Sequence, residues 1–136
     1  MISSGLATVI VSDMDRAVRF YSEVLELKLV FRFGNDWASI SAGEGLTIGL
    51  HPASEHLPAG KKGSTTIGLN VSKPLDEVIG VLKDRGVTIK GEIIDDEMLK
   101  VQYIEDPDGN ELYLAEMKAQ YQNYDQELGA RQWGAA

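Results

Sequence analysis

The sequence predicts an α+β protein made of two tandem βαβββ modules, and three observations support this prediction. A strand pattern followed by a helix pattern occurs twice, with Val11-Ser12 and Val71-Ser72 at matching points before the two helices. Apolar, β-branched segments follow each helix pattern, as expected for strands. Asp106-Pro107-Asp108-Gly109 then joins two apolar runs as a tight turn, because Pro107 presets its own φ angle and Gly109 tolerates a positive φ.

The first module is predicted to span residues 1–51. Asp13 offers an N-cap to an amphipathic helix over residues 14–25, in which apolar side chains recur at helical spacing. The strands of this module are predicted over residues 6–11, 27–33, 37–41 and 46–51. Residues 52–64 hold two Pro and two Gly without a period, which is typical of a linker.

The second module is predicted to span residues 65–117. Ser72 is an N-cap candidate for a second amphipathic helix, which ends near Gly86. The strands are predicted over residues 65–71, 87–94, 99–104 and 112–114. Residues 118–136 form a polar tail with aromatic residues and a leucine at helical spacing, so a C-terminal helix is expected there. The two modules together are expected to form one domain.

The charge and composition restrict the class of partner. The 136-residue chain carries a net charge of −8, which repels nucleic-acid phosphates and is compatible with a cationic small ligand. No stretch is long and apolar enough to span a membrane, and no signal peptide is recognised. The chain has no Cys, which excludes thiolate chemistry and fits a cytoplasmic protein.

Three stretches of this chain resemble the glyoxalase, bleomycin-resistance and extradiol dioxygenase superfamily, also called vicinal oxygen chelate proteins. They are residues 9–27 with Phe20-Tyr21 on the predicted helix, residues 66–71, and residues 106–112 with the Asp-Pro-Asp-Gly turn. The resemblance implies that each module curls its four strands into an incomplete barrel and that paired modules enclose a ligand cavity. It also implies a homodimer, and it leaves open whether the modules pair within one chain or between two chains.

In metal-dependent members of this superfamily, His and Glu side chains hold one divalent ion. Residue by residue, the resemblance places those four ligand positions at Leu6, Gly49, Thr66 and Tyr113. Leu and Gly have no donor atom, a Thr hydroxyl is a weak ligand, and a phenol would have to ionise. His51 and Glu111 share faces with two of these positions, but two ligands are too few for a catalytic site. We therefore expect neither a metal nor another cofactor.

The first functional hypothesis is a metal-free protein of the bleomycin-resistance type that sequesters a small aromatic or cationic molecule. The predicted cavity combines the four former ligand positions with neighbouring polar and aromatic side chains. Its residues are Leu6, Arg32, Phe33, Trp37, Gly49, His51, Thr66, Met98, Tyr103 and Tyr113.

Two other hypotheses stay open. The chain could be a lyase, isomerase or dioxygenase with an altered metal site built from His51 and Glu111, or an enzyme that uses Tyr113 as an acid without a metal. Alternatively, side chains could fill the cavity, so that dimerisation and the aromatic tail carry the function. No catalytic residue is assigned from the sequence.

Overall fold

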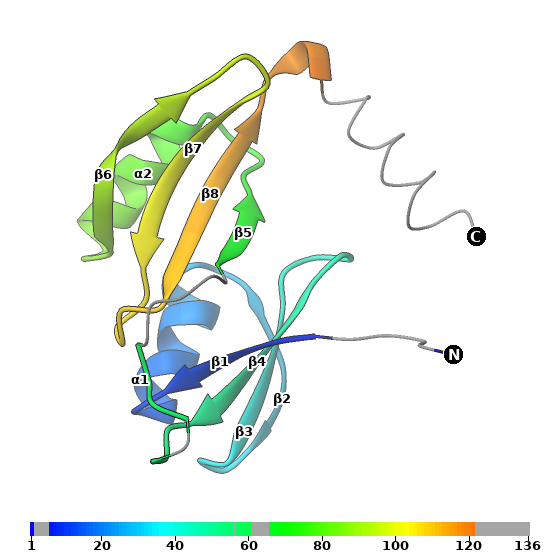
Figure 1. Ribbon diagram of the computed structural model, residues 1–136, viewed down its shortest axis with the longest axis vertical. Helices are drawn as coiled ribbons and strands as arrows, with labels where there is room; N and C mark the ends of the chain where they lie inside the picture. Colours follow the sequence, from blue (N-terminus) through cyan, green and yellow to red (C-terminus); the bar gives the residue numbers. More distant parts are fainter. Residues whose placement is uncertain (2–5, 56, 61–65, 122–136) are drawn as a thin grey trace.

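The computed structural model describes residue 1 and residues 6–55, 57–60 and 66–121, which form two sheets of four strands (Figure 1). The first module contains β1 (Ala7–Val11), α1 (Met14–Arg19), β2 (Lys28–Phe33), β3 (Trp37–Ser41) and β4 (Thr47–Pro52). The second module contains β5 (Ile67–Asn70), α2 (Leu75–Asp84), β6 (Thr88–Asp95), β7 (Leu99–Glu105) and β8 (Glu111–Met117). A short 3-10 turn, Ala119–Tyr121, follows β8.

Both sheets have the same topology. The strand orders are β1-β4-β3-β2 and β5-β8-β7-β6, and in each sheet the first strand runs parallel to the last while the other neighbours are antiparallel. The predicted pair of βαβββ modules is therefore confirmed. None of the described helices is both long and apolar enough to cross a bilayer. The predicted helix in the tail falls mostly on residues 122–136, which lie outside the described residues, as do residues 56 and 61–64 of the predicted linker and residue 65 of the second module.

The first predicted helix is correct in position but changes its winding. Asp13 caps α1 as expected, because its carboxylate accepts a hydrogen bond from the amide of Arg16 at 3.0 Å. After Arg19 the chain continues as a π-helical turn, Phe20–Val24, so the region is not one uniform α-helix. The wider turn places both Phe20 and Tyr21 in the core.

The N-cap predicted at Ser72 is wrong. The cap position of α2 is Pro74, whose side chain makes no capping bond, and a carboxylate oxygen of Glu116 on β8 accepts from the amide of Leu75 at 2.6 Å. A negative charge at a helix N-terminus is favourable because it meets the positive end of the helix dipole. The cap thus comes from a residue 41 positions away, which local sequence patterns cannot reveal.

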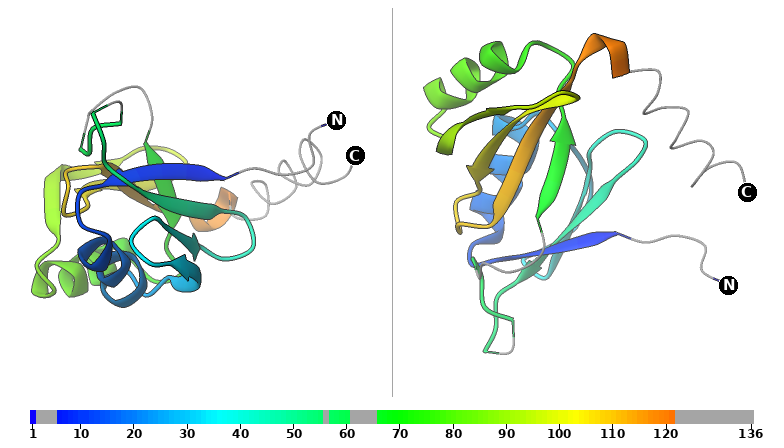
Figure 2. Two further views of the ribbon diagram at one scale, coloured as in Figure 1. Left: turned by 90° about the horizontal axis from the view of Figure 1, so that it is seen from below. Right: turned by 45° about the horizontal axis from the view of Figure 1, so that its top comes forward.

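The core lies between each sheet and its helix, and Figure 2 shows the elements of both modules from two further directions. Alternate strand residues point to the helix side and are buried there, as the period of two requires. In the first sheet these are Val9, Val11, Ala38, Ile40, Ile48 and Leu50. In the second sheet they are Ile67, Ile104, Leu112 and Leu114. We call the opposite side of each sheet its open face.

The β7–β8 turn, residues 106–110, joins the two modules. Asp106 is buried, and its carboxylate accepts bonds from the amides of Asp108 and Asn110 at 2.9 and 2.8 Å. Asp106 and Asp108 therefore act as turn formers, as the sequence predicts. Three hydrogen bonds also tie the turn to the first module. Tyr21 Oη donates to the carboxylate of Asp106 at 3.0 Å, and Asn110 Nδ2 donates to the carbonyl of Ile10 at 2.9 Å. The hydroxyl of Ser12 donates to the carboxylate of Asp108.

Candidate functional site

The open face of the first sheet carries an indole ring laid across a glycine. A Cβ atom added at Gly49 would overlap the ring of Trp37, so only glycine leaves room for the ring in this position. The indole N–H donates to the hydroxyl of Ser39 at 2.8 Å. The ring of His51 meets that of Trp37 edge to face, with centroids 6.4 Å apart and an interplanar angle of 74°.

The open face of the second sheet repeats this arrangement with different residues. Gly68 and Tyr113 are direct partners on β5 and β8, and a Cβ at Gly68 would overlap the phenol ring of Tyr113. Tyr103, the partner of Tyr113 on β7, holds its ring at a tilt of 57° with centroids 5.8 Å apart. We call these two features, Trp37 over Gly49 and Tyr113 over Gly68, the aromatic floors.

Large apolar side chains surround the aromatic floors and are exposed to solvent. Phe31 and Phe33 on β2 share the open face of the first sheet, because they pair with Ser39 and Trp37, and they are 54% and 64% exposed. Ile94 on β6 is 52% exposed on the second sheet. Phe31 and Phe33 lie two positions apart on one face of β2, and exposed apolar side chains that cluster in this way are typical of a ligand or protein interaction site.

The structure groups most of the predicted cavity residues on the two open faces. Those on or directly before strands of the first sheet are Leu6, Phe33, Trp37, Gly49 and His51. Those of the second sheet are Thr66, Tyr103 and Tyr113. Trp37, Gly49 and Tyr113 of the aromatic floors are residues that sequence reasoning selected. Gly68 was missed, because only the geometry shows that its lack of a Cβ leaves room for the ring of Tyr113.

Arg32 and Met98 lie apart from both aromatic floors. The guanidinium of Arg32 forms an ion pair with Asp15 of α1, and its Nε donates to the carbonyl of Gly34 at 2.8 Å. Its side chain is thus directed to the helix side of the first sheet. Met98 belongs to the β6–β7 turn and is 38% exposed.

The four positions that correspond to metal ligands do not fit a divalent ion. Thr66 uses its hydroxyl to donate to the carbonyl of Glu111 at 3.2 Å, and the ring of Tyr113 packs over Gly68. Leu6 and Gly49 supply no donor atom, and the ring of Trp37 covers Gly49. Among the residues that the structure describes, no three His, Asp or Glu side chains form a group that could hold a metal.

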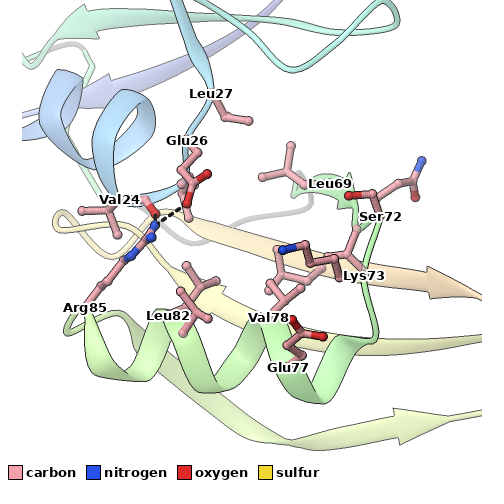
Figure 3. A pocket seen from close by; sticks show the side chains of 15 residues that line it. Val24, Glu26, Leu27, Leu69, Ser72, Lys73, Glu77, Val78, Leu82 and Arg85 are labelled. Carbon is pink, nitrogen blue, oxygen red and sulfur yellow. Dashed lines mark hydrogen bonds and ion pairs between the residues drawn. The ribbon is translucent and has the colours of Figure 1, made fainter.

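A groove between the modules is a further feature that sequence reasoning missed. It has a volume of about 330 Å³ and lies between α2, β5 and the chain that leads from the π-helical turn to β2 (Figure 3). Arg85 closes one end by pairing with Glu26 at 2.8 Å and donating to the carbonyl of Val24 at 2.7 Å. None of the predicted cavity residues lines this groove, which is assembled from segments distant in sequence.

The contact between Tyr21 and the β7–β8 turn, which we call the junction, has the largest pKa shift found among the described residues. Burial, with the nearby charge of Asp106, raises the pKa of the Tyr21 phenol well above its ordinary value. Burial also raises the pKa of Asp106, against the opposing effect of the hydrogen bonds that its carboxylate accepts. Tyr21 is fully buried, and its hydrogen bond to Asp106 links the first module to the β7–β8 turn.

Comparison with known proteins gives a consistent family. The model of the Glyoxalase/Bleomycin resistance protein/Dioxygenase superfamily matches residues 4–114. No curated protein matches the chain. Among solved structures, it is similar to TnmS3, an antibiotic binding protein from Streptomyces sp. CB03234, with 25% identity and a TM-score of 0.70 over 87% of this chain and 99% of that one.

Two further structures have the same fold. A glyoxalase/bleomycin resistance protein from the same Streptomyces strain is 26% identical, with a TM-score of 0.66 over 82% of this chain and 98% of that one. Lactoylglutathione lyase from Agrobacterium tumefaciens is 19% identical, with a TM-score of 0.66 over 85% and 95% of the two chains. Solved structures with this fold thus include both an antibiotic binding protein and a lyase. The family match and the repeated sheet topology lead to one conclusion: the chain belongs to the glyoxalase/bleomycin resistance protein/dioxygenase superfamily.

Proposed function

We propose that this protein binds a planar aromatic small molecule without a metal ion, and that it favours cationic aromatics. The aromatic floors carry this proposal, because Trp37 and Tyr113 each present a ring on an open face. Such rings attract flat ligands by stacking and attract cations through their π-electrons. The net charge of −8 adds a long-range attraction for a cation. The similar protein TnmS3 is an antibiotic binding protein, which supports binding as the function.

The absence of metal from this proposal rests on the side chains at the site. The two aromatic floors take up the places at Gly49 and Tyr113 where the metal-dependent relatives would place acidic ligands. A bound metal would polarise an oxygen of the ligand, whereas ring surfaces can only hold and orient it. Sequestration of the ligand is therefore the proposed outcome, and the protein needs no catalytic residue for it.

We further propose that a second copy of the chain completes the cavity. One open face cannot enclose a ligand, and exposed Phe31, Phe33 and Ile94 provide apolar surface for a partner. Within the described part of one chain, the hydrogen bonds between modules leave from β1, α1 and the π-helical turn rather than from the open faces. The open face of the first sheet of one copy would then cover the open face of the second sheet of the other. A two-fold symmetric dimer formed in this way contains two equivalent sites.

Thermal unfolding of chelator-treated protein tests ligand binding. N-methylquinolinium and N-methylacridinium are the aromatic cations, and N,N-dimethylpiperidinium is the saturated control cation. An aromatic probe at 100 times its dissociation constant should stabilise the fold by about 2.7 kcal/mol. Trp37→Leu should remove this effect, whereas Trp133→Phe, outside the described residues, should keep it. Equal stabilisation by the saturated cation, or by a divalent metal alone, would contradict the proposal.

A mixing experiment tests the two-chain cavity. Trp37→Leu damages the floor of the first sheet and Tyr113→Ala damages that of the second, so each variant alone should bind no probe. In a mixed dimer, one site combines the two intact floors, and random exchange of equal amounts should restore about a quarter of the sites. No recovery after exchange, or a monomer by light scattering, would refute the shared cavity.

A further inference from the structure

We infer that His51 presents a hydrogen-bond acceptor to the ligand, and that the ligand class is therefore a planar aromatic carrying an O–H or N–H donor. This inference rests on the proposed function and adds to it a polar group that strengthens binding of the ligand. Its basis is the contact between Nδ1 of His51 and the carbonyl oxygen of Pro52, 2.8 Å apart. A carbonyl oxygen can only accept, so Nδ1 carries the proton of the neutral ring.

The proton on Nδ1 determines what the other ring nitrogen can do. In the neutral imidazole, Nε2 then holds a lone pair and accepts hydrogen bonds only. No partner for Nε2 is found among the described residues, and the His51 ring lies edge to face with Trp37. The imidazole that carries this acceptor lies beside the indole of the first aromatic floor, so a ligand stacked there would be its neighbour.

The other polar groups of this open face do not require a hydrogen-bond donor on the ligand. The indole N–H, the only donor of the Trp37 side chain, already donates to the hydroxyl of Ser39 at 2.8 Å. The hydroxyl groups of Thr8, Ser39 and Thr47 can donate or accept, so they adapt to either kind of ligand. Nε2 of His51 is the group that distinguishes ligands with a donor from ligands without one, because a ligand without a donor would bury the Nε2 lone pair with no hydrogen bond. The cost of such a buried, unpaired acceptor corresponds to between about fivefold and about 150-fold in affinity.

The first test needs no ligand. Nitrogen-15 NMR of the imidazole rings distinguishes the two neutral tautomers by their nitrogen shifts. At alkaline pH, His51 should show a protonated Nδ1 and a bare Nε2. The opposite tautomer would overturn the inference, whatever the protein binds. This measurement uses the wild-type chain, so it stays decisive even if a His51 variant fails to fold.

The second test compares two ligands that differ in one donor. 2-Naphthol and 2-methoxynaphthalene share a ring system and an oxygen, but only the naphthol donates; both are titrated calorimetrically at pH 8. Wild-type protein should bind 2-naphthol at least about fivefold more tightly. His51→Phe should abolish this preference and keep ring contact, whereas His51→Gln, whose side-chain carbonyl accepts, should retain it.

The outcomes separate this inference from the proposed function. Equal affinity of the wild type for the two naphthalenes would overturn the inference and leave aromatic binding standing. Binding of N-methylquinolinium with no binding of 2-naphthol would also overturn it. Failure of the naphthalenes and both aromatic cations would instead overturn the proposed function.

Discussion

Tyr21→Phe isolates the hydrogen bond that ties the first module to the β7–β8 turn. The change removes only a hydroxyl, which bonds to the carboxylate of Asp106 at 3.0 Å, and Tyr21 is 0% exposed, so water cannot replace the bond. A hydrogen bond to a charged acceptor contributes about 1.5–3 kcal/mol to stability. Asp106 keeps its hydrogen bonds from Asp108 and Asn110 in this variant. We therefore expect the free energy of unfolding to fall by about 2 kcal/mol and the midpoint of thermal unfolding to fall by about 4–8 °C.

Urea unfolding at pH 7 measures this difference, and alkaline pH provides an independent check. The pKa of Tyr21 is raised in the folded state, so above its ordinary value of 10.0 the unfolded chain binds fewer protons than the folded chain. The free energy of unfolding must then fall as pH rises above 10, by up to about 1.4 kcal/mol per pH unit from this group. Tyr21→Phe lacks this contribution, so the difference in free energy of unfolding between the wild type and the variant should become smaller above pH 10.

Tyr103→Phe is the matched control, since no hydrogen bond of its hydroxyl is found in the described part of the chain, and it should change stability by less than about 0.5 kcal/mol. A Tyr21→Phe protein as stable as the wild type, or a gap that stays constant above pH 10, would refute this account of the junction.

Three other predictions concern the floors, the helices and metals. Gly49→Ala should lower the free energy of unfolding by about 1–3 kcal/mol and weaken probe binding, because the added Cβ displaces the ring of Trp37. Gly80→Ala, on the solvent-exposed side of α2, should raise it by about 0.5–1 kcal/mol, and urea unfolding compares the two variants; equal effects would contradict the packing argument. Glu116→Gln should lower stability by about 0.5–1 kcal/mol through the weakened cap of α2, measured in low salt, and an unchanged midpoint would exclude a role for its charge. Nickel, zinc, manganese or iron(II) added to chelator-treated protein should leave the midpoint unchanged within experimental error; a rise of several degrees with one metal that His51→Ala removes would favour the enzyme hypothesis.

The fold could be predicted from sequence because its main determinants are local. Alternation of apolar residues specifies the strands, and the Asp-Pro-Asp-Gly turn specifies the hairpin between β7 and β8. The two predictions that were wrong, the N-cap of α2 and the place of Arg32 in the cavity, depend on partners in other elements. Glu116 caps α2 from another strand, and Arg32 turns toward Asp15 rather than toward a floor. No periodicity contains this information, because it arises only when the elements meet.

The candidate site was predictable in part for the same reason. Strand parity places His51 on the same face as Gly49, and Trp37 can be selected from its place in a predicted strand, so both could be selected without coordinates. The role of Gly49 as the space beneath an indole, and the proton position on His51, require the distances themselves. The groove closed by Arg85 was missed because its walls belong to both modules.

The junction also dictates an order of events during synthesis. Its bonds connect residues 85 to 100 positions apart, such as Tyr21 with Asp106 and Ile10 with Asn110. A ribosome adding about 5–20 residues per second needs roughly 5–20 s to deliver the second partner after the first. During this interval the carboxylate of Asp106 is not yet available to the Tyr21 hydroxyl of the π-helical turn. The bonds that join the two modules can therefore form only after the β7–β8 turn has been synthesised.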